Sequence, residues 1–331
     1  MQLSEDHLPL TQSMICIVGP TASGKTDVAQ ELALRHNGEV ISADSMQIYK
    51  GMDIGTGKIS VDEKQVPHWG LDLVEPGTPY SAALFQDYAR NAIQDIDARG
   101  KLPIMAGGTG LYVRAAIDDY DFPSGEQDPR LNETRARYTQ FLNEEGAQAL
   151  WDKLNELDPE SAAIIHPNNS KRVIRAFEMW ELEGKRYVDQ HAGFETMQQV
   201  IPAVIFEMDV TPTLLAERIS RRVDGMITKG LLDEVKDLVD AGFISALTAR
   251  EAIGYKEFVD IVTGADTNDN ALQEAIDQVK TASRRYAKRQ RSWWRTDNRV
   301  VRIPADDADV QRICDDIDHV LERKGWPHVV C

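Results

Sequence analysis

The sequence has 331 residues, 42% hydrophobic and 27% charged, which suits a globular protein of one or two domains. No apolar run is long enough to span a membrane, residues 1–10 lack a signal pattern, and the distant Cys16, Cys314 and Cys331 indicate neither a disulfide framework nor a zinc site. The formal net charge of −17 argues against a nucleic-acid partner unless basic residues cluster locally. We therefore expect a cytoplasmic protein, monomeric and without a membrane partner.

The first elements in chain order are a strand, a glycine-rich loop and a helix. The apolar run at 14–18 predicts a buried parallel strand, and the amphipathic stretch at 27–36 predicts a helix. Further strands are predicted at 39–43 and 102–106, the latter after a helical stretch at 82–99. Such alternation predicts an α/β fold, a doubly wound parallel sheet with a P-loop.

The sequence pattern changes after about residue 117. An acidic, turn-rich connection at 118–123 precedes helical patterns with almost no β-branched runs, and a strand pattern returns at 201–209. We interpret 117–200 as a helical insertion domain between a first core part, 1–116, and a mainly helical second part, 201–331. The predicted helices are 130–143, 146–157 and 169–183 in the insertion, then 212–229, 231–241, 249–262, 271–295 and 309–324.

The glycine-rich loop fits the pattern G-x-x-x-x-G-K-[ST] between a predicted strand and a predicted helix, the context that this phosphate-binding motif requires. Its backbone N–H groups can surround phosphate oxygens, and the helix N-terminus adds positive potential. Lys25 supplies a point charge, and the Thr26 hydroxyl is the expected ligand of Mg²⁺. The expected phosphate-binding residues are Gly19, Pro20, Thr21, Ala22, Ser23, Gly24, Lys25 and Thr26.

Two further positions suit chemistry next to this loop. The strand at 102–106 ends in glycines and Thr109, where an ATPase or GTPase usually has a metal-binding aspartate. Thr109 can bond a phosphate oxygen or a leaving group; a tight turn is the alternative. Asp44 stands at the carboxyl end of a strand, where ligands bind in open parallel sheets. Its position suits a general base, and the alternative is an Asx turn or helix cap.

Basic residues cluster in three places. In the helix predicted at 169–183, Lys171, Arg172 and Arg175 lie on one side, and Val173, Ile174, Phe177 and Trp180 on the other. In the helix at 271–295, a stripe of Arg284, Arg285, Lys288, Arg291 and Arg295 lies opposite Tyr286, Gln290, Trp293 and Trp294. These stripes suit RNA phosphates, with solvated helix faces as the alternative. Arg218 and Arg222 share a helix face and suit a diphosphate, with an ion-paired face as the alternative.

Several motifs together resemble the bacterial tRNA dimethylallyltransferases. They comprise the phosphate loop, Ile41–Lys58 with its Asp-Ser-Met-Gln segment, Gly107–Tyr112, Ile165–Asn168, Lys171–Arg175, Ala252–Lys256 and Lys288–Arg295. The resemblance extends from about residue 14 to about residue 302. The stretch 184–199 matches no motif of the family, so its role stays open.

The resemblance implies that the loop binds dimethylallyl diphosphate rather than ATP. It also implies that Asp44 is the general base, that Thr109 assists at the reacting centre, and that the acceptor is the exocyclic amine of the adenosine 3′ of the anticodon in tRNA. Lys25, the third expected catalytic residue, would stabilise the charge of the departing diphosphate. The tRNA-binding residues expected on this basis and from the basic stripes are Asp44, Ser45, Met46, Gln47, Arg135, Lys171, Arg172, Val173, Ile174, Arg175, Gly254, Tyr255, Lys256, Lys288, Arg289, Arg291 and Arg295.

Three other functions compete with this interpretation. A P-loop kinase of small metabolites explains the loop but neither the basic helices nor the missing aspartate. A prenyltransferase of free adenine nucleotides leaves the insertion and the stripe at Lys288–Arg295 without a role. A non-catalytic RNA-binding protein leaves the intact phosphate loop without a purpose.

Overall fold

The computed structural model describes residues 13–120, 122, 130–192, 198–246 and 248–327. Residues 1–10 and Cys331, on which part of the sequence interpretation rests, lie outside this range. The chain divides into two compact units, one of Met1–Asp118 with Gln199–Cys331 and one of Asp119–Gln198. Among the described residues, no helix is long and apolar enough to cross a membrane.

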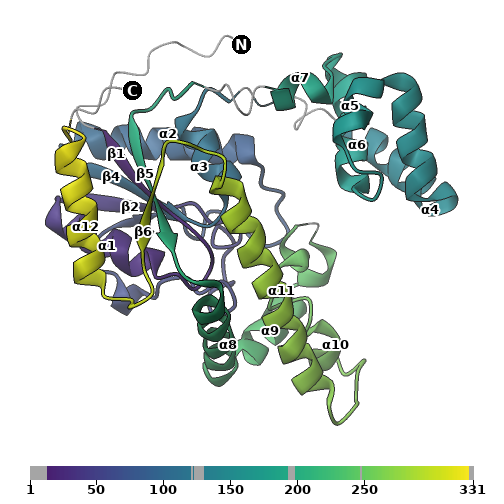
Figure 1. The fold of residues 1–331 in the computed structure, drawn as a ribbon. Helices are drawn as coiled ribbons and strands as arrows, with labels where there is room; N and C mark the ends of the chain where they lie inside the picture. Colours follow the sequence, from purple (N-terminus) through teal and green to yellow (C-terminus); the bar gives the residue numbers. More distant parts are fainter. Residues whose placement is uncertain (1–12, 121, 123–129, 193–197, 247, 328–331) are drawn as a thin grey trace. The chain divides into compact units, whose positions relative to one another are not determined.

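The larger unit is built on a sheet of six parallel strands in the order β3-β2-β4-β1-β5-β6 (Figure 1). The strands are β1 (Met14–Val18), β2 (Gly38–Ser42), β3 (His68–Trp69), β4 (Leu102–Gly107), β5 (Ala203–Asp209) and β6 (Val300–Pro304). This confirms the predicted α/β class with a doubly wound parallel sheet. Two edge strands were not predicted, because β3 has only two residues and β6 is largely half-exposed.

Alternate residues of each buried strand pack against different helices. Ile15 and Ile17 belong to the core beneath α1 (Lys25–Arg35) and α12 (Val310–Arg323), whereas Cys16 belongs to the core on the other face. The helices α2 (Ala82–Ala98) and α3 (Gly110–Ile117) cover that other face (Figure 1). Since both faces are covered, the strands are continuous apolar runs, as parallel strands usually are.

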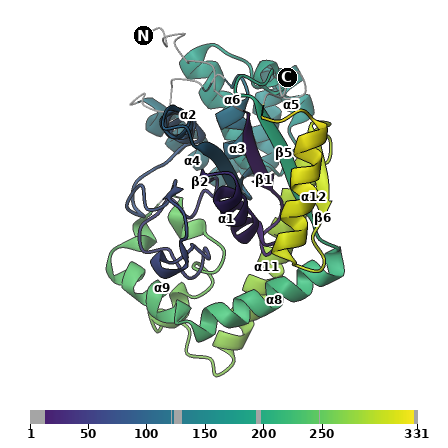
Figure 2. The ribbon, with the colours of Figure 1, turned by 90° about the vertical axis from the view of Figure 1, so that its left-hand side faces the viewer.

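Further helices lie at the carboxyl ends of the strands (Figure 2). They are α8 (Pro212–Thr228), α9 (Leu231–Asp240), α10 (Val259–Val262) and α11 (Ala271–Trp294), and α11 packs against α8. The prediction of a single helix at 249–262 is wrong. The chain instead forms one 3₁₀ turn at Ala249–Glu251 and the short α10, because Gly254 between them has a φ of +90°, a conformation that ends a helix.

The smaller unit consists of α4 (Arg130–Leu157), α5 (Pro159–Ile164), α6 (Ser170–Glu183) and α7 (Tyr187–Ala192). Gly146, with a φ of +87°, breaks α4 into the two helices that the sequence predicts. Asp158 caps α5 by accepting a hydrogen bond from the Ser161 N–H. The rings of Tyr138 and Phe177 stack at 4.0 Å in the small hydrophobic core of this unit.

Candidate active site

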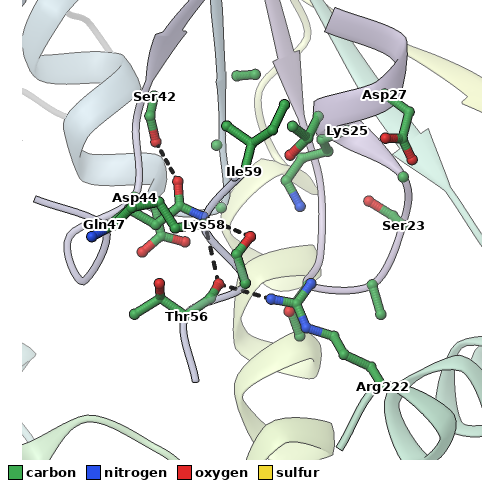
Figure 3. Close-up of a pocket in the computed structure, with 18 of the residues that line it drawn as sticks. Ser23, Lys25, Asp27, Ser42, Asp44, Gln47, Thr56, Lys58, Ile59 and Arg222 are labelled. Atoms are coloured by element: carbon green, nitrogen blue, oxygen red, sulfur yellow. Dashed lines mark hydrogen bonds between the residues drawn. The ribbon is translucent and has the colours of Figure 1, made fainter. Parts of the chain in front are cut away.

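A cavity of about 1020 Å³ lies where β1, β2 and β4 end. The phosphate loop follows β1, Asp44 follows β2, and Gly107 and Gly108 end β4 and begin the next turn. Figure 3 shows Lys25, Asp44 and Arg222 around the same space. Because parallel strands end at one edge, three loops that are distant in sequence come together here, as the predicted fold requires.

The phosphate loop is shaped by hydrogen bonds to its own backbone. The Ser23 hydroxyl and the Lys25 ammonium both donate to the Pro20 carbonyl, at 2.8 and 2.6 Å. Gly19 has a φ of +139°, and a Cβ there would lie 3.1 Å from the Met208 oxygen, so only glycine fits without a shift. The loop therefore starts in close contact with β5.

Lys25, which is partly buried, shares the cavity with a second cation, Arg222. Burial lowers the pKa of Lys25 to about 7; the Asp44 carboxylate counteracts this effect and the Arg222 guanidinium adds to it. Burial also lowers the pKa of Arg222, although an arginine stays protonated at neutral pH. A dianionic or trianionic ligand would relieve both effects, so the electrostatics of the cavity favour a polyanion.

Two arginines of α8, Arg218 and Arg222, line the cavity. Arg222 donates to the Thr56 carbonyl at 2.8 Å (Figure 3). Arg218 donates to the carbonyls of Ala305 and Asp306, at 3.0 and 2.6 Å, and also lines the cavity. Their described hydrogen-bond partners are backbone carbonyls rather than carboxylates. The Asp44 carboxylate offsets part of the Arg222 charge, and both guanidinium groups can still bind an anion.

The loops after β2 and β4 are joined by hydrogen bonds of Thr109, which follows the cavity-lining Gly107 and Gly108. The Thr109 hydroxyl accepts a hydrogen bond from the Ser45 N–H at 3.1 Å, and the Thr109 N–H donates to the Ala43 carbonyl at 3.1 Å. Asp44 accepts from the Met46 N–H at 2.9 Å, which is the Asx turn considered as its alternative role. The half-exposed carboxylate still lines the cavity, so the turn orients it without removing it.

Sequence reasoning missed two residues of α11 that line the cavity. Gln290, buried at 5% exposure, accepts from the Thr21 N–H at 2.8 Å and donates to the Gly108 carbonyl at 3.0 Å. Burial raises the pKa of Tyr286 to about 12, and the negative charge of Asp44 contributes to the rise. The available signal was a glutamine in the middle of an otherwise apolar helix face, because a buried amide needs partners.

Comparison with known proteins identifies the family. A family model described as IPP transferase matches residues 47–297, and one described as isopentenyl transferase matches residues 12–66. A tRNA dimethylallyltransferase of Geobacillus thermodenitrificans is 47% identical over 86% of this chain and 88% of its own length. This chain belongs to the IPP transferase family.

Solved structures agree with this assignment. The full-length tRNA isopentenylpyrophosphate transferase of Bacillus halodurans is 42% identical, with a TM-score of 0.67 and coverage of 95% of this chain and 98% of its own. A eukaryotic dimethylallyltransferase acting on tRNA is 27% identical, with a TM-score of 0.77 and coverage of 95% and 79%. The suspected resemblance is thereby confirmed.

The basic stripe of this IPP transferase lies along α11, on a different side from Gln290. Lys288, Arg289 and Arg295 are exposed, whereas Arg291 is partly buried and forms an ion pair with Asp209 at 3.3 Å. A second cavity, of about 710 Å³, opens between this side of α11 and α8, with Arg284, Lys288, Arg291 and Arg295 among its lining residues. The cations of the stripe therefore gather around a depression rather than on a convex face.

In the smaller unit of this IPP transferase, the basic residues of α6 divide into two groups. Lys171 and Arg172 are exposed, while Arg175 and Arg135 both pair with the buried carboxylate of Glu178. Val173 and Ile174, expected among the tRNA contacts, are buried at 0% and 8% exposure in the core of this unit, so that expectation is wrong for their side chains. They face inward because apolar residues on one side of a helix form its packing face.

A second correction concerns Gly254, Tyr255 and Lys256. Tyr255 is fully buried and donates from its hydroxyl to Glu234 at 2.6 Å, and Gly254 donates its N–H to Glu257 at 2.8 Å. Of the three, only Lys256 is exposed. The side chain of Tyr255 is therefore a packing element of the core and not an RNA contact.

Proposed function

We propose that this IPP transferase moves the dimethylallyl group of dimethylallyl diphosphate to the N6 amine of the adenosine 3′ of the anticodon in tRNA, releasing diphosphate. The names of the relatives support this reaction. The observation that carries it is one cavity that holds a phosphate loop, two arginines with backbone partners, and a carboxylate after the neighbouring strand. These groups suit a diphosphate donor and an acceptor that must lose a proton.

The donor end of the reaction requires stabilisation of a leaving diphosphate. An adenine amine is a poor nucleophile because its lone pair is delocalised into the ring, so the allylic C–O bond must weaken as the new C–N bond forms. Lys25, Arg222 and the loop N–H groups would stabilise the departing negative charge. Preorganised donors of this kind contribute roughly 3 kcal/mol each in well-studied enzymes.

The acceptor end requires a base. Once the C–N bond forms, the amine nitrogen carries a surplus proton, and Asp44 at the edge of the cavity would take it. Thr109, whose hydroxyl accepts from the Ser45 N–H, fixes the turn beside Asp44 and would assist the reaction from there. The bonds balance: C–O breaks, C–N forms, diphosphate leaves and one proton passes to the carboxylate.

Mg²⁺ is part of the proposal. Among the described residues, no group of three or more His, Cys, Asp or Glu side chains could hold a metal ion. Mg²⁺ often takes most of its ligands from substrate phosphates and water. We therefore expect the ion to be bound mainly by diphosphate oxygens and water, with the exposed Thr26 at the start of α1 supplying one hydroxyl ligand. When bound there, Mg²⁺ would neutralise charge on the diphosphate.

The tRNA would be held by phosphate contacts from the exposed cations of α11 and α6, which are Lys171, Arg172, Lys288, Arg289 and Arg295. Ser45, Met46 and Gln47, half-exposed beside Asp44, would meet the target nucleotide. We further propose that the enzyme is a monomer and acts in the cytoplasm; the tRNA in the names of its relatives supports the location.

The deciding experiment is mass analysis of the nucleosides of unmodified tRNA after incubation with the protein, Mg²⁺ and dimethylallyl diphosphate. We expect one adenosine per tRNA, 3′ of the anticodon, to gain a dimethylallyl group. Incubation with ATP serves as the parallel reaction. Hydrolysis of ATP without nucleoside modification would overturn the proposal in favour of a kinase.

A further inference from the structure

Glu234, in the first turn of α9, does not line the cavity, yet its carboxylate accepts four hydrogen bonds. Three come from consecutive backbone N–H groups of Asp53, Ile54 and Gly55, at 3.2, 2.8 and 3.2 Å. The fourth comes from the buried Tyr255 hydroxyl at 2.6 Å. A carboxylate with this many donors is an anchor, because removing it would leave several N–H groups without an acceptor.

The anchored segment continues into the carbonyl groups that orient two cavity residues. The Thr56 carbonyl accepts from the Arg222 guanidinium at 2.8 Å and from the Gln47 side-chain amide at 3.4 Å. The Gly57 carbonyl also accepts from Gln47 at 3.4 Å. Arg222 and Gln47 therefore take their directions from a loop whose own position depends on Glu234.

The loop fits between its neighbours only because it lacks side chains at two places. A Cβ on Gly55 would lie 2.4 Å from the ring of Tyr255, and a Cβ on Gly57, whose φ is +63°, would lie 2.1 Å from the Arg222 guanidinium. Lys58 closes the far end by bonding the Asp53 carboxylate at 2.5 Å and the Tyr49 carbonyl at 2.9 Å. A loop packed this closely transmits a displacement at Gly55 to Arg222.

We propose that Glu234 is a positioning residue that acts on the diphosphate through Arg222. Its carboxylate fixes the segment from Asp53 to Thr56, and the Thr56 carbonyl then aims the guanidinium into the cavity. This inference rests on the proposed function, because it assigns Arg222 to the diphosphate. In E234Q the amide NH₂ would face backbone N–H donors, so the loop must move even though the size of the side chain is unchanged.

The test is a double-mutant cycle of E234Q and R222A. Inorganic diphosphate binding is measured by calorimetry, and kcat and KM for dimethylallyl diphosphate are measured with tRNA. We expect E234Q to weaken diphosphate binding and lower kcat/KM for the donor by about tenfold, and to have little further effect once R222A is present. D233N is the matched control, since it removes one exposed charge from the same helical turn and should resemble the wild type.

Y255F provides a second variant, because it removes one donor to Glu234 and retains the carboxylate; a smaller loss of affinity in the same direction is expected. The inference is overturned if E234Q binds diphosphate as D233N does, if R222A leaves diphosphate binding unchanged, or if E234Q causes its full effect in the R222A background. Absence of prenyl transfer by the wild type would instead contradict the proposed function, while the diphosphate measurements would still report on Glu234.

Discussion

The side-chain oxygen of Gln290 accepts a hydrogen bond from the backbone N–H of Thr21 at 2.8 Å. The same amide donates to the Gly108 carbonyl, so one residue of α11 joins the loops after β1 and β4. A Cβ on Gly108 would lie 2.0 Å from the Gln290 nitrogen, which shows how closely the parts meet. The phosphate loop is therefore held in shape by the helix that carries the basic stripe.

Replacing Gln290 with alanine should destabilise the protein by about 1–3 kcal/mol, because the Thr21 N–H and the Gly108 carbonyl would no longer have this partner. Diphosphate binding should weaken as well, since the loop that receives it is no longer supported. Urea unfolding with and without inorganic diphosphate measures both effects. R289A, which changes the exposed neighbouring residue, is the control for stability; equal stability of Q290A and R289A would contradict this prediction.

The lowered pKa of Lys25 predicts that the protein takes up a proton when the donor binds. Its pKa is lowered from 10.5 to about 7, so at pH 8 the free protein holds it mostly neutral, and an anionic diphosphate should raise the pKa and draw in a proton. Affinity for diphosphate should therefore fall as the pH rises above 7. Calorimetry at pH 8 in two buffers with different ionisation enthalpies measures the uptake, which should vanish in Lys25→Met.

The same pKa shift of Lys25 determines whether its contribution to stability rises or falls with pH. The folded-state pKa of Lys25 lies below its unfolded value, so between about pH 7 and 10.5 the unfolded chain binds more protons at this group. Its contribution should make the protein more stable as the pH rises through that window. Comparison of wild type with Lys25→Met by urea unfolding isolates this contribution, and a difference that does not vary with pH would argue against the shift.

Asp44→Asn should slow the chemical step by roughly a hundredfold or more, because a base acts in the transition state. Binding of diphosphate and of tRNA should change little, since the amide keeps the size of the side chain. Single-turnover transfer separates chemistry from binding. Asp87→Asn, on the exposed side of α2, is the control. A near-normal single-turnover rate in Asp44→Asn would remove this residue from the mechanism.

Alanine at Lys171, Lys288 and Arg295 should weaken tRNA binding and lower its salt dependence, by roughly one unit of slope for each phosphate that is no longer neutralised. Arg291 should matter less per charge, because Asp209 already pairs with it. Affinity measured over a range of salt concentrations is the test, and Lys236→Ala, exposed on α9, is the control. Unchanged slopes with intact folding would mean that these cations are only solvated.

Much of the fold could be predicted because its signals are local. The apolar runs of β1, β2, β4 and β5, the phosphate-loop pattern and the Asp158 cap each depend on a few adjacent residues. The edge strands were missed because β3 and β6 have weak apolar patterns. The predicted helix at 249–262 does not form as one helix, because Gly254 adopts a positive φ that interrupts the periodic apolar pattern.

The candidate site was predictable where a motif identified it and not where tertiary contacts build it. Lys25, Asp44 and Thr109 follow strands, so the sheet brings them to one edge. Gln290 and Glu234 act through partners 269 and about 180 positions away, which no local spacing reveals. For Tyr255 the motif misled: it predicted a contact with tRNA, whereas the side chain is buried in the core.

The bond between Thr21 and Gln290 also bears on how the protein is made. The strand β1 and the phosphate loop are synthesised before their partners, since β1 pairs with β5 and the loop is bonded to Gln290 of α11. Contacts so distant along the chain form late and slow the search for the native state. A ribosome that stops before residue 290 thus releases a phosphate loop without its support, and an incomplete polypeptide lacks the assembled donor pocket.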